Sequence, residues 1–189
     1  AGAITRGKVL VKGINPFHLN AFLNLMNRSG AWVDTGENWI LINCQNTRSF
    51  NPLQVKTSPY PGFPTDLQAA LMAFLATVKG KSSIKETVFE GRFSHVSELC
   101  RLGAKITVSN STAYIEGTEP LTGAEVEAGD IRAGAALVLA GLCAKGTTII
   151  GGVKHLRRGY ENLEDKLRSL GANIKSINKP DLELLLVGC

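Results

Sequence analysis

An internal repeat is the feature of this sequence that most restricts how the chain can fold. Acidic, basic and glycine residues of one segment recur in a second segment at a nearly constant distance. The marker pairs are Asp66 and Asp130 (64 residues apart), Gly80 and Gly146 (66), Arg92 and Arg158 (66), and Gly103 and Gly171 (68). Spacings that agree this closely indicate a real repeat, so one structural unit is used more than once.

A third, partial copy of the unit opens the chain. Gly7 lies 73 residues before Gly80, and Gly30 lies the same distance before Gly103. The position that matches Asp66 would fall before residue 1, so we expect an incomplete first copy that lacks sequence in front of it. The predicted organisation is a single domain, residues 1–189, with repeats at about 1–45, 50–118 and 121–187.

The apolar pattern predicts helices that are buried inside sheets. Residues 67–78 and 133–144 are apolar on all sides, as in fully buried helices. A second, amphipathic helix in each copy has one apolar face that ends at Leu102 or Leu170, just before a Gly-Ala pair whose glycine can end the helix in the left-handed conformation. Predicted strands follow at 105–108, 112–115, 173–177 and 182–187. The expected fold is therefore an inside-out α/β arrangement.

Composition and charge narrow the classes of function. The chain has 21 basic and 16 acidic residues, a net charge of +5, and most of its basic residues are interleaved with acids. This pattern predicts a mildly basic, solvated surface and no nucleic-acid-binding arm. The longest apolar stretches are too short for a membrane span, and no secretory signal opens the chain. We therefore expect a cytoplasmic protein that does not enter the membrane.

The cysteines do not predict a metal site. Cys44, Cys100, Cys143 and Cys189 are widely spaced and have no histidine nearby at the spacing of metal ligands. We expect reduced thiols, with Cys100 and Cys143 buried on helices.

Acidic residues at two predicted helix starts have both a structural and a functional interpretation. Residues 65–68 fit a capping box, in which Thr65 is the N-cap and Gln68 reaches back to it. Asp66 would complement the positive end of the helix dipole, and Asp130 can cap the later helix. In the functional interpretation, the two carboxylates occupy equivalent places in the repeat and belong to one site.

Three arginines are harder to explain by stability alone. Arg92 and Arg158 lie just before, or in the first turn of, the second predicted helices of their repeats, and Arg132 lies in the first turn of a buried helix. A cation at the positive end of a helix costs about 0.3 to 1 kcal/mol unless an anion is present. Guanidinium groups and backbone N–H groups together favour phosphate or carboxylate. The alternative is local pairing, of Arg132 with Asp130 or of Arg92 with Glu90.

Four long motifs resemble a single enzyme family. They lie in order at residues 61–69, 86–96, 129–141 and 158–167. The motifs resemble the UDP-N-acetylglucosamine enolpyruvyl transferases, and the resemblance runs from residue 1 to residue 189 against the C-terminal part of the family. It implies an inside-out α/β barrel lobe of the enolpyruvyl transferase type, one of two lobes that are each built from three repeats.

The resemblance also implies a reaction and a set of site residues. The family transfers enolpyruvyl from phosphoenolpyruvate to the 3′-hydroxyl of UDP-N-acetylglucosamine and releases phosphate, in peptidoglycan precursor synthesis, and it implies no metal or organic cofactor. Asp66 matches the carboxylate at the sugar hydroxyl and is the candidate general base, while Asp130 matches a second carboxylate implied in proton transfer. Thr65 and Val88 match positions that bind UDP-N-acetylglucosamine. The positions that match phosphoenolpyruvate-binding residues are Arg92, Arg132 and Arg158.

The family's cysteine-bearing loop and its phosphate-contacting lysine have no counterpart in this sequence. We therefore expect the chain alone not to turn over substrate, and expect its partner to be the missing N-terminal part of the enzyme. Three alternatives remain. An enolpyruvylshikimate-phosphate synthase would share fold and chemistry, but its motifs differ at 63–66 and 158–161. The others are a non-catalytic isolated lobe or structural partner, and an RNA-binding repeat module, which would need exposed aromatic residues among basic ones.

Overall fold

The computed structural model describes residues 1–117, 120–179 and 182–188. Its first segment places a helix beside an antiparallel sheet. The elements are β1 (Lys8–Lys12), a 3-10 turn η1 (Pro16–Leu19), α1 (Asn20–Arg28), β2 (Trp32–Thr35) and β3 (Trp39–Asn43). The strand order is β1-β3-β2. Within the described residues, β1 has a partner strand on one edge only.

The second segment forms a four-stranded sheet and the first of two buried helices. Its elements are β4 (Gln54–Lys56), η2 (Thr65–Leu67), α2 (Gln68–Ala76), β5 (Gly80–Lys85), α3 (Val96–Arg101), β6 (Lys105–Ser109) and β7 (Thr112–Gly117). The order of the strands is β4-β5-β7-β6. The pair β4 and β5 is parallel, and the other pairs are antiparallel.

The third segment repeats this arrangement with one addition. Its elements are β8 (Glu125–Glu127), α4 (Ile131–Gly141), β9 (Thr147–Gly151), α5 (Val153–Arg157), α6 (Leu163–Ser169), β10 (Asn173–Lys179) and β11 (Leu182–Gly188). The order β8-β9-β11-β10, with β8 parallel to β9, matches the second sheet strand for strand. The short helix α5 was not predicted. It follows β9, at the position where the second segment has a loop after β5.

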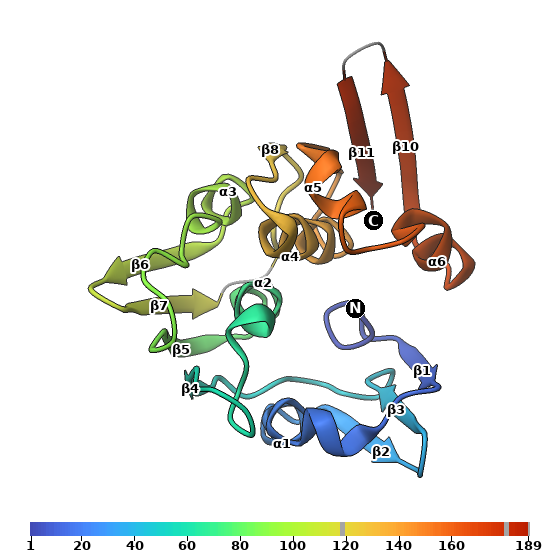
Figure 1. The fold of residues 1–189 in the computed structure, drawn as a ribbon. Helices are drawn as coiled ribbons and strands as arrows, with labels where there is room; N and C mark the ends of the chain where they lie inside the picture. The colour runs from blue at the N-terminus through green and yellow to red at the C-terminus, as the bar shows by residue number, and fades with distance from the viewer. Residues whose placement is uncertain (118–119, 180–181, 189) are drawn as a thin grey trace.

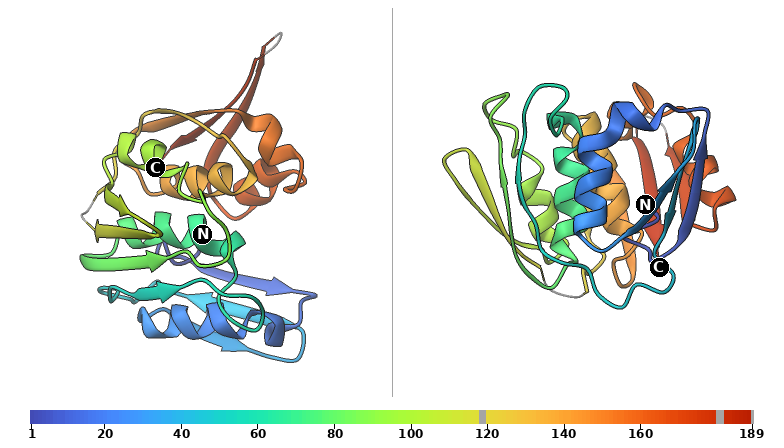
Figure 2. Two further views of the ribbon diagram at one scale, coloured as in Figure 1. Left: turned by 60° about the vertical axis from the view of Figure 1, so that its left-hand side comes forward. Right: turned by 90° about the horizontal axis from the view of Figure 1, so that it is seen from below.

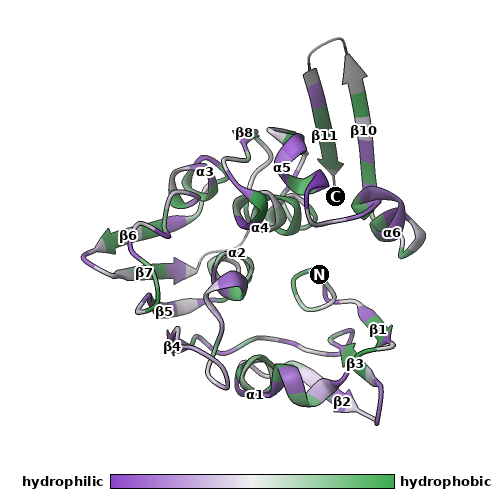
Figure 3. Ribbon diagram, viewed as in Figure 1, coloured by the Kyte–Doolittle hydropathy of each residue, from purple (hydrophilic) through white to green (hydrophobic). Residues whose placement is uncertain are grey.

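The helices α2 and α4 pack against each other inside the lobe, with the sheets outside them (Figures 1 and 2). Met72 and Leu75 of α2 and Leu137 of α4 are completely buried, and the apolar character of both helices can be followed in Figure 3. A β-carbon at Gly134 would collide with Leu156, so α5 approaches the backbone of α4 closely. The predicted buried helices and outer sheets are therefore confirmed.

The ends of the amphipathic helices agree only partly with the sequence prediction. Gly103 and Gly171 have φ angles of +88° and +97°, as expected for glycines that end helices. The prediction that the apolar face of the last helix extends to Leu170 is wrong, because Leu170 is 61% exposed. Instead, Glu164 of α6 is buried, since Arg157 Nη1 donates to its Oε2 at 2.7 Å and also pairs with Glu183 of β11. Leu163 and Leu167 of the predicted face do pack against the core, and the charges of Arg157, Glu164 and Glu183 add a second connection between α5, α6 and β11.

The cysteine expectations need one correction. Cys44, Cys100 and Cys143 are free thiols, and Cys189 lies outside the described residues. Cys100 is exposed and Cys143, which follows the end of α4, is half-buried, so the predicted burial of both is wrong. In the described part of the chain, no group of three potential metal ligands comes together. No helix there is long and apolar enough to cross a bilayer.

The buried helix pair should dominate stability. We predict that Leu75→Ala lowers the free energy of unfolding by about 2 to 5 kcal/mol, because it leaves a cavity among fully buried side chains. Leu170→Ala removes the same atoms from an exposed position and should change that free energy by less than about 0.5 kcal/mol. Urea unfolding followed by circular dichroism measures both variants, and equal losses would contradict the assignment of the core to α2 and α4.

Candidate active site

Asp66 lies in the 3-10 turn that leads into α2, and its side chain is 78% exposed. The predicted capping box is wrong, because the N-cap is Pro64 and the Thr65 hydroxyl donates to Glu86 Oε2 at 2.8 Å. Among the described residues, the buried amide nitrogen of Gln68 has no hydrogen-bond partner. The Asp66 carboxylate therefore makes no capping hydrogen bond at this helix start. Its Oδ1 lies 3.4 Å from Arg92 Nη1.

The loop after β5 holds Arg92 beside Asp66. The guanidinium carbon of Arg92 lies 4.1 Å from the centroid of the Phe89 ring, a cation–π contact, and the side chain is only 20% exposed. Arg92 pairs with Asp66, so the alternative pairing with Glu90 is not observed. The aromatic ring and the carboxylate together hold this cation at the start of α2.

Glu86 organises the same loop from within. Its carboxylate is buried and accepts the backbone N–H groups of Val88 and Phe89 at 2.8 and 3.2 Å. Burial alone would raise the pKa of Glu86, but hydrogen bonds from Thr57, Val88, Thr65 and Phe89 outweigh burial and lower it.

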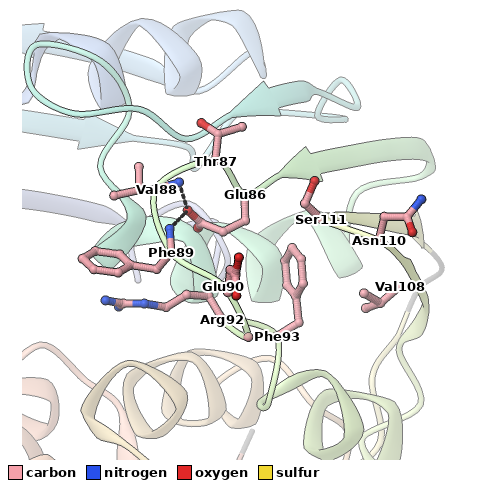
Figure 4. A pocket seen from close by; sticks show the side chains of 11 residues that line it. Glu86, Thr87, Val88, Phe89, Glu90, Arg92, Phe93, Val108, Asn110 and Ser111 are labelled. Atoms are coloured by element: carbon pink, nitrogen blue, oxygen red, sulfur yellow. Dashed lines mark hydrogen bonds between the residues drawn. The ribbon is translucent and has the colours of Figure 1, made fainter.

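A pocket of about 710 Å³ opens along this loop (Figure 4). Its walls are the loop 86–93 on one side and Val108, Asn110 and Ser111 of the β6–β7 hairpin on the other. Figure 4 shows Phe89 and Arg92 lying alongside each other on the loop. Apolar rings and a few polar groups in one hollow are typical of a small-molecule site.

At the start of α4, Asp130 is the N-cap, as predicted. Its Oδ1 accepts the backbone N–H groups of Arg132 and Ala133 at 2.7 and 3.0 Å, and its Oδ2 accepts Arg132 Nη2 at 3.0 Å. The local pairing of Arg132 with Asp130 is therefore observed. His95 is buried at the start of α3. Burial lowers the pKa of His95 to about 4, and the negative charge of Asp130 acts in the opposite direction.

Arg158 is not at the start of a helix. It is the C-cap residue of α5, so the prediction that it precedes the second helix directly overlooked α5. A cation is favourable at this end of a helix, whereas at a helix start it is not. The residues that follow connect the two halves of the site. A β-carbon at Gly159 would collide with Ile131 of α4, and the pKa of Tyr160 is raised by burial and by the charge of Asp66.

The structure thus brings the starts of α2 and α4 to the same end of the lobe. Gly159, next to Arg158, approaches Ile131 between Asp130 and Arg132, and the charge of Asp66 raises the pKa of the neighbouring Tyr160 together with burial. Sequence reasoning missed the contributions of Glu86, Phe89, His95 and Tyr160. All four lie inside the recognised motifs, but periodicity gave no reason to single them out.

Comparison with known proteins identifies relatives of this arrangement. Residues 1–167 match the family described as EPSP synthase (3-phosphoshikimate 1-carboxyvinyltransferase). The chain is 51% identical over 178 residues to UDP-N-acetylglucosamine 1-carboxyvinyltransferase 2 of Carboxydothermus hydrogenoformans, covering 94% of this chain and 42% of the relative. It is 48% identical over 175 residues to UDP-N-acetylglucosamine 1-carboxyvinyltransferase of Xylella fastidiosa, covering 93% and 41%. The chain thus spans less than half the length of these relatives.

Solved structures show the same lobe. The enolpyruvyl transferase NikO from Streptomyces tendae superposes with a TM-score of 0.84 at 28% identity, covering 94% of this chain and 43% of NikO. EPSP synthase from Acinetobacter baumannii superposes with a TM-score of 0.74 at 20% identity, over 100% of this chain and 43% of that protein, which shows the fold alone. The inside-out lobe expected from the sequence is confirmed.

The buried His95 should make stability depend on pH. Because its pKa is about 4 in the folded chain and 6.5 ordinarily, the unfolded chain binds the proton first as pH falls below 6.5. Stability is therefore full above pH 6.5, and roughly 2 kcal/mol should be lost between pH 7 and pH 5.

Urea unfolding at pH 7 and pH 5 tests this dependence. His95→Leu should abolish most of the loss, whereas His18→Gln, at an exposed histidine, should keep it. A pH dependence that survives in His95→Leu would contradict the assignment.

Proposed function

This chain belongs to the EPSP synthase (3-phosphoshikimate 1-carboxyvinyltransferase) family, and from that membership we propose that it forms one lobe of a particular enolpyruvyl transferase. The enzyme transfers enolpyruvyl from phosphoenolpyruvate to the 3′-hydroxyl of UDP-N-acetylglucosamine and releases phosphate. The proposal includes a cytoplasmic role in peptidoglycan precursor synthesis, and it requires no metal or organic cofactor.

The choice of acceptor rests on a contrast among the relatives. Proteins named for UDP-N-acetylglucosamine are 45 to 51% identical to this chain, whereas the EPSP synthase structures are 18 to 20% identical. The shared fold alone does not distinguish UDP-N-acetylglucosamine from the acceptor of the EPSP synthases. The higher sequence identity to the proteins named for UDP-N-acetylglucosamine is therefore the observation that carries the proposal.

Asp66 is the proposed general base. Its exposed carboxylate is free of capping duty and can accept the proton of the sugar hydroxyl while that oxygen forms a bond to the enolpyruvyl carbon. Val88 and Thr65 are the proposed sugar-nucleotide contacts. Because Val88 N–H and the Thr65 hydroxyl proton are donated to Glu86, the Val88 carbonyl and the lone pairs of the Thr65 hydroxyl are what remain for the substrate.

Arg92, Arg132 and Arg158 are the proposed phosphoenolpyruvate residues. Fixed guanidinium groups stabilise charge that grows on a departing phosphate and donate in pairs to a carboxylate. Asp130 is the proposed second proton-transfer group. Its Oδ1 accepts from two backbone N–H groups, so Oδ2, which faces Arg132, is the atom that can exchange a proton with the substrate.

We predict that the chain alone releases no phosphate from phosphoenolpyruvate and UDP-N-acetylglucosamine. It spans 42% of the Carboxydothermus relative, and a cleft enzyme needs its second lobe to exclude water and complete its charges. Mixing the chain with the remaining portion of that relative should restore phosphate release, measured by a coupled colorimetric assay. Steady release by the purified chain alone, or none from the mixture, would contradict the proposal, and the second result would favour a non-catalytic lobe.

The role of Asp66 can be tested in the restored enzyme. Asp66→Asn keeps the size of the side chain and makes no cap, so the free energy of unfolding should change by less than about 1 kcal/mol. The rate of phosphate release should fall about 10² to 10⁴-fold, because the base is lost. A normal rate together with a large loss of stability would reverse the assignment and make Asp66 a structural residue.

A further inference from the structure

Glu86 is a buried carboxylate beside the Asp66 turn and the Val88 loop, and the proposed reaction gives it no role. It is 4% exposed, although an unpaired carboxylate is rarely buried. Its Oε1 accepts from the Thr57 hydroxyl at 2.7 Å and from the backbone N–H groups of Val88 and Phe89, while its Oε2 accepts from the Thr65 hydroxyl at 2.8 Å. Four donors thus converge on one side chain.

These donors come from three separate segments of the chain. Thr57 follows β4, Thr65 opens the turn that carries Asp66, and Val88 and Phe89 lie in the loop that carries Arg92. Figure 4 shows the carboxylate of Glu86 pointing toward the nitrogen atoms of Val88 and Phe89. The carboxylate of Glu86 therefore joins the Asp66 turn to the Val88 loop from the buried side, in addition to the ion pair between Arg92 and Asp66.

The other copy of the repeat shows what the site looks like without this bridge. Applying the repeat spacings, Gly129 matches Thr65 and Gly152 matches Glu86, so the third segment has neither partner. There, Asp130 itself accepts the N–H groups at the start of its helix, with extended backbone angles. In the second segment, Asp66 is inside the turn and directs its carboxylate outward. The copy that has the hydrogen bond between Thr65 and Glu86 is therefore the copy in which the aspartate, Asp66, does not cap its helix.

We propose that Glu86 is a positioning residue that fixes Asp66 and the Val88 main chain relative to each other, through Thr65 and through the two backbone N–H groups. The inference rests on the proposed function, because it gives Glu86 a part in the same sugar-nucleotide site. A carboxylate suits the task because its two oxygens accept on both sides at once. Glutamine would keep the shape but present an N–H₂ group to one of the hydroxyl donors, and aspartate is too short to reach both sides.

The experiment compares Glu86→Gln and Glu86→Asp with a pair at another donor to the same carboxylate, Thr57→Val and Thr57→Ser, because Thr57 is not a proposed substrate contact. Glu37→Gln, at an exposed carboxylate in the turn between β2 and β3, is the control. Amide hydrogen exchange of Val88 and Phe89 is measured by NMR in the chain. Steady-state kinetics are measured in the enzyme restored with the remaining portion of the relative.

In Glu86→Gln, exchange at Val88 and Phe89 should be about 10-fold faster or more, as expected when a charge-assisted hydrogen bond is weakened. The KM for UDP-N-acetylglucosamine should rise and kcat should fall, each about 10-fold, while the KM for phosphoenolpyruvate stays within about 2-fold. Thr57→Val should shift the kinetics in the same direction, Thr57→Ser should keep normal kinetics, and Thr57→Val in the Glu86→Gln background should add little.

Unchanged exchange at both amides in Glu86→Gln would overturn the proposal, as would equal changes in both KM values, which indicate general loosening. If Glu86→Gln does not fold, Thr57→Val decides, and unchanged exchange at Val88 and Phe89 with normal kinetics in that variant overturns the proposal. If the wild-type mixture has no activity, the proposed function fails. Positioning is then judged by amide exchange: faster exchange confined to Val88 and Phe89 supports it, and uniform or unchanged exchange contradicts it.

Discussion

The packing of α2 against α4 is the contact on which the rest of the structure depends. Both helices are buried, so their ends cannot move independently of the lobe. The turn 158–160 touches the start of α4 and lies within electrostatic reach of Asp66 at the start of α2. An apolar contact at the centre of the lobe therefore places four charged side chains, two from each helix region, at one end of it.

The two complete copies of the repeat use the same acid in different ways. Asp130 satisfies the helix start and pairs with Arg132, next to it in sequence, whereas Asp66 leaves helix capping and meets Arg92 from a distant loop. Repetition thus supplies the scaffold, and local substitutions at the helix starts make the two acids differ in exposure and in partner.

Local patterns predicted the parts of the molecule that local physics decides. The repeat spacing, the buried helices 67–78 and 133–144, and the cap at Asp130 follow from apolar periodicity and neighbouring side chains. The capping box at Thr65 failed because a competing acceptor, Glu86, arrives from 21 residues away. The position of Arg158 failed because α5 replaces a loop, and the burial of Leu170 failed because Arg157 draws a glutamate inward instead. The error at Thr65 comes from a partner distant in sequence, whereas the errors at Arg158 and Leu170 come from a short helix and a charge pair that apolar periodicity does not detect.

In the described part of the chain, one edge of β1 has no partner strand, and this affects how two copies can meet in solution. An edge strand offers unpaired N–H and C=O groups to any other strand, and Leu10 and Val11 on β1 are exposed. β1 also begins and ends with lysine, so a second copy aligned antiparallel about Leu10 would set Lys8 against Lys12 at both ends of the pair. Like charges directly opposite each other oppose pairing. The lysines of β1 thus disfavour pairing with β1 of a second copy, whereas they would not oppose a strand that carries acidic residues at those positions.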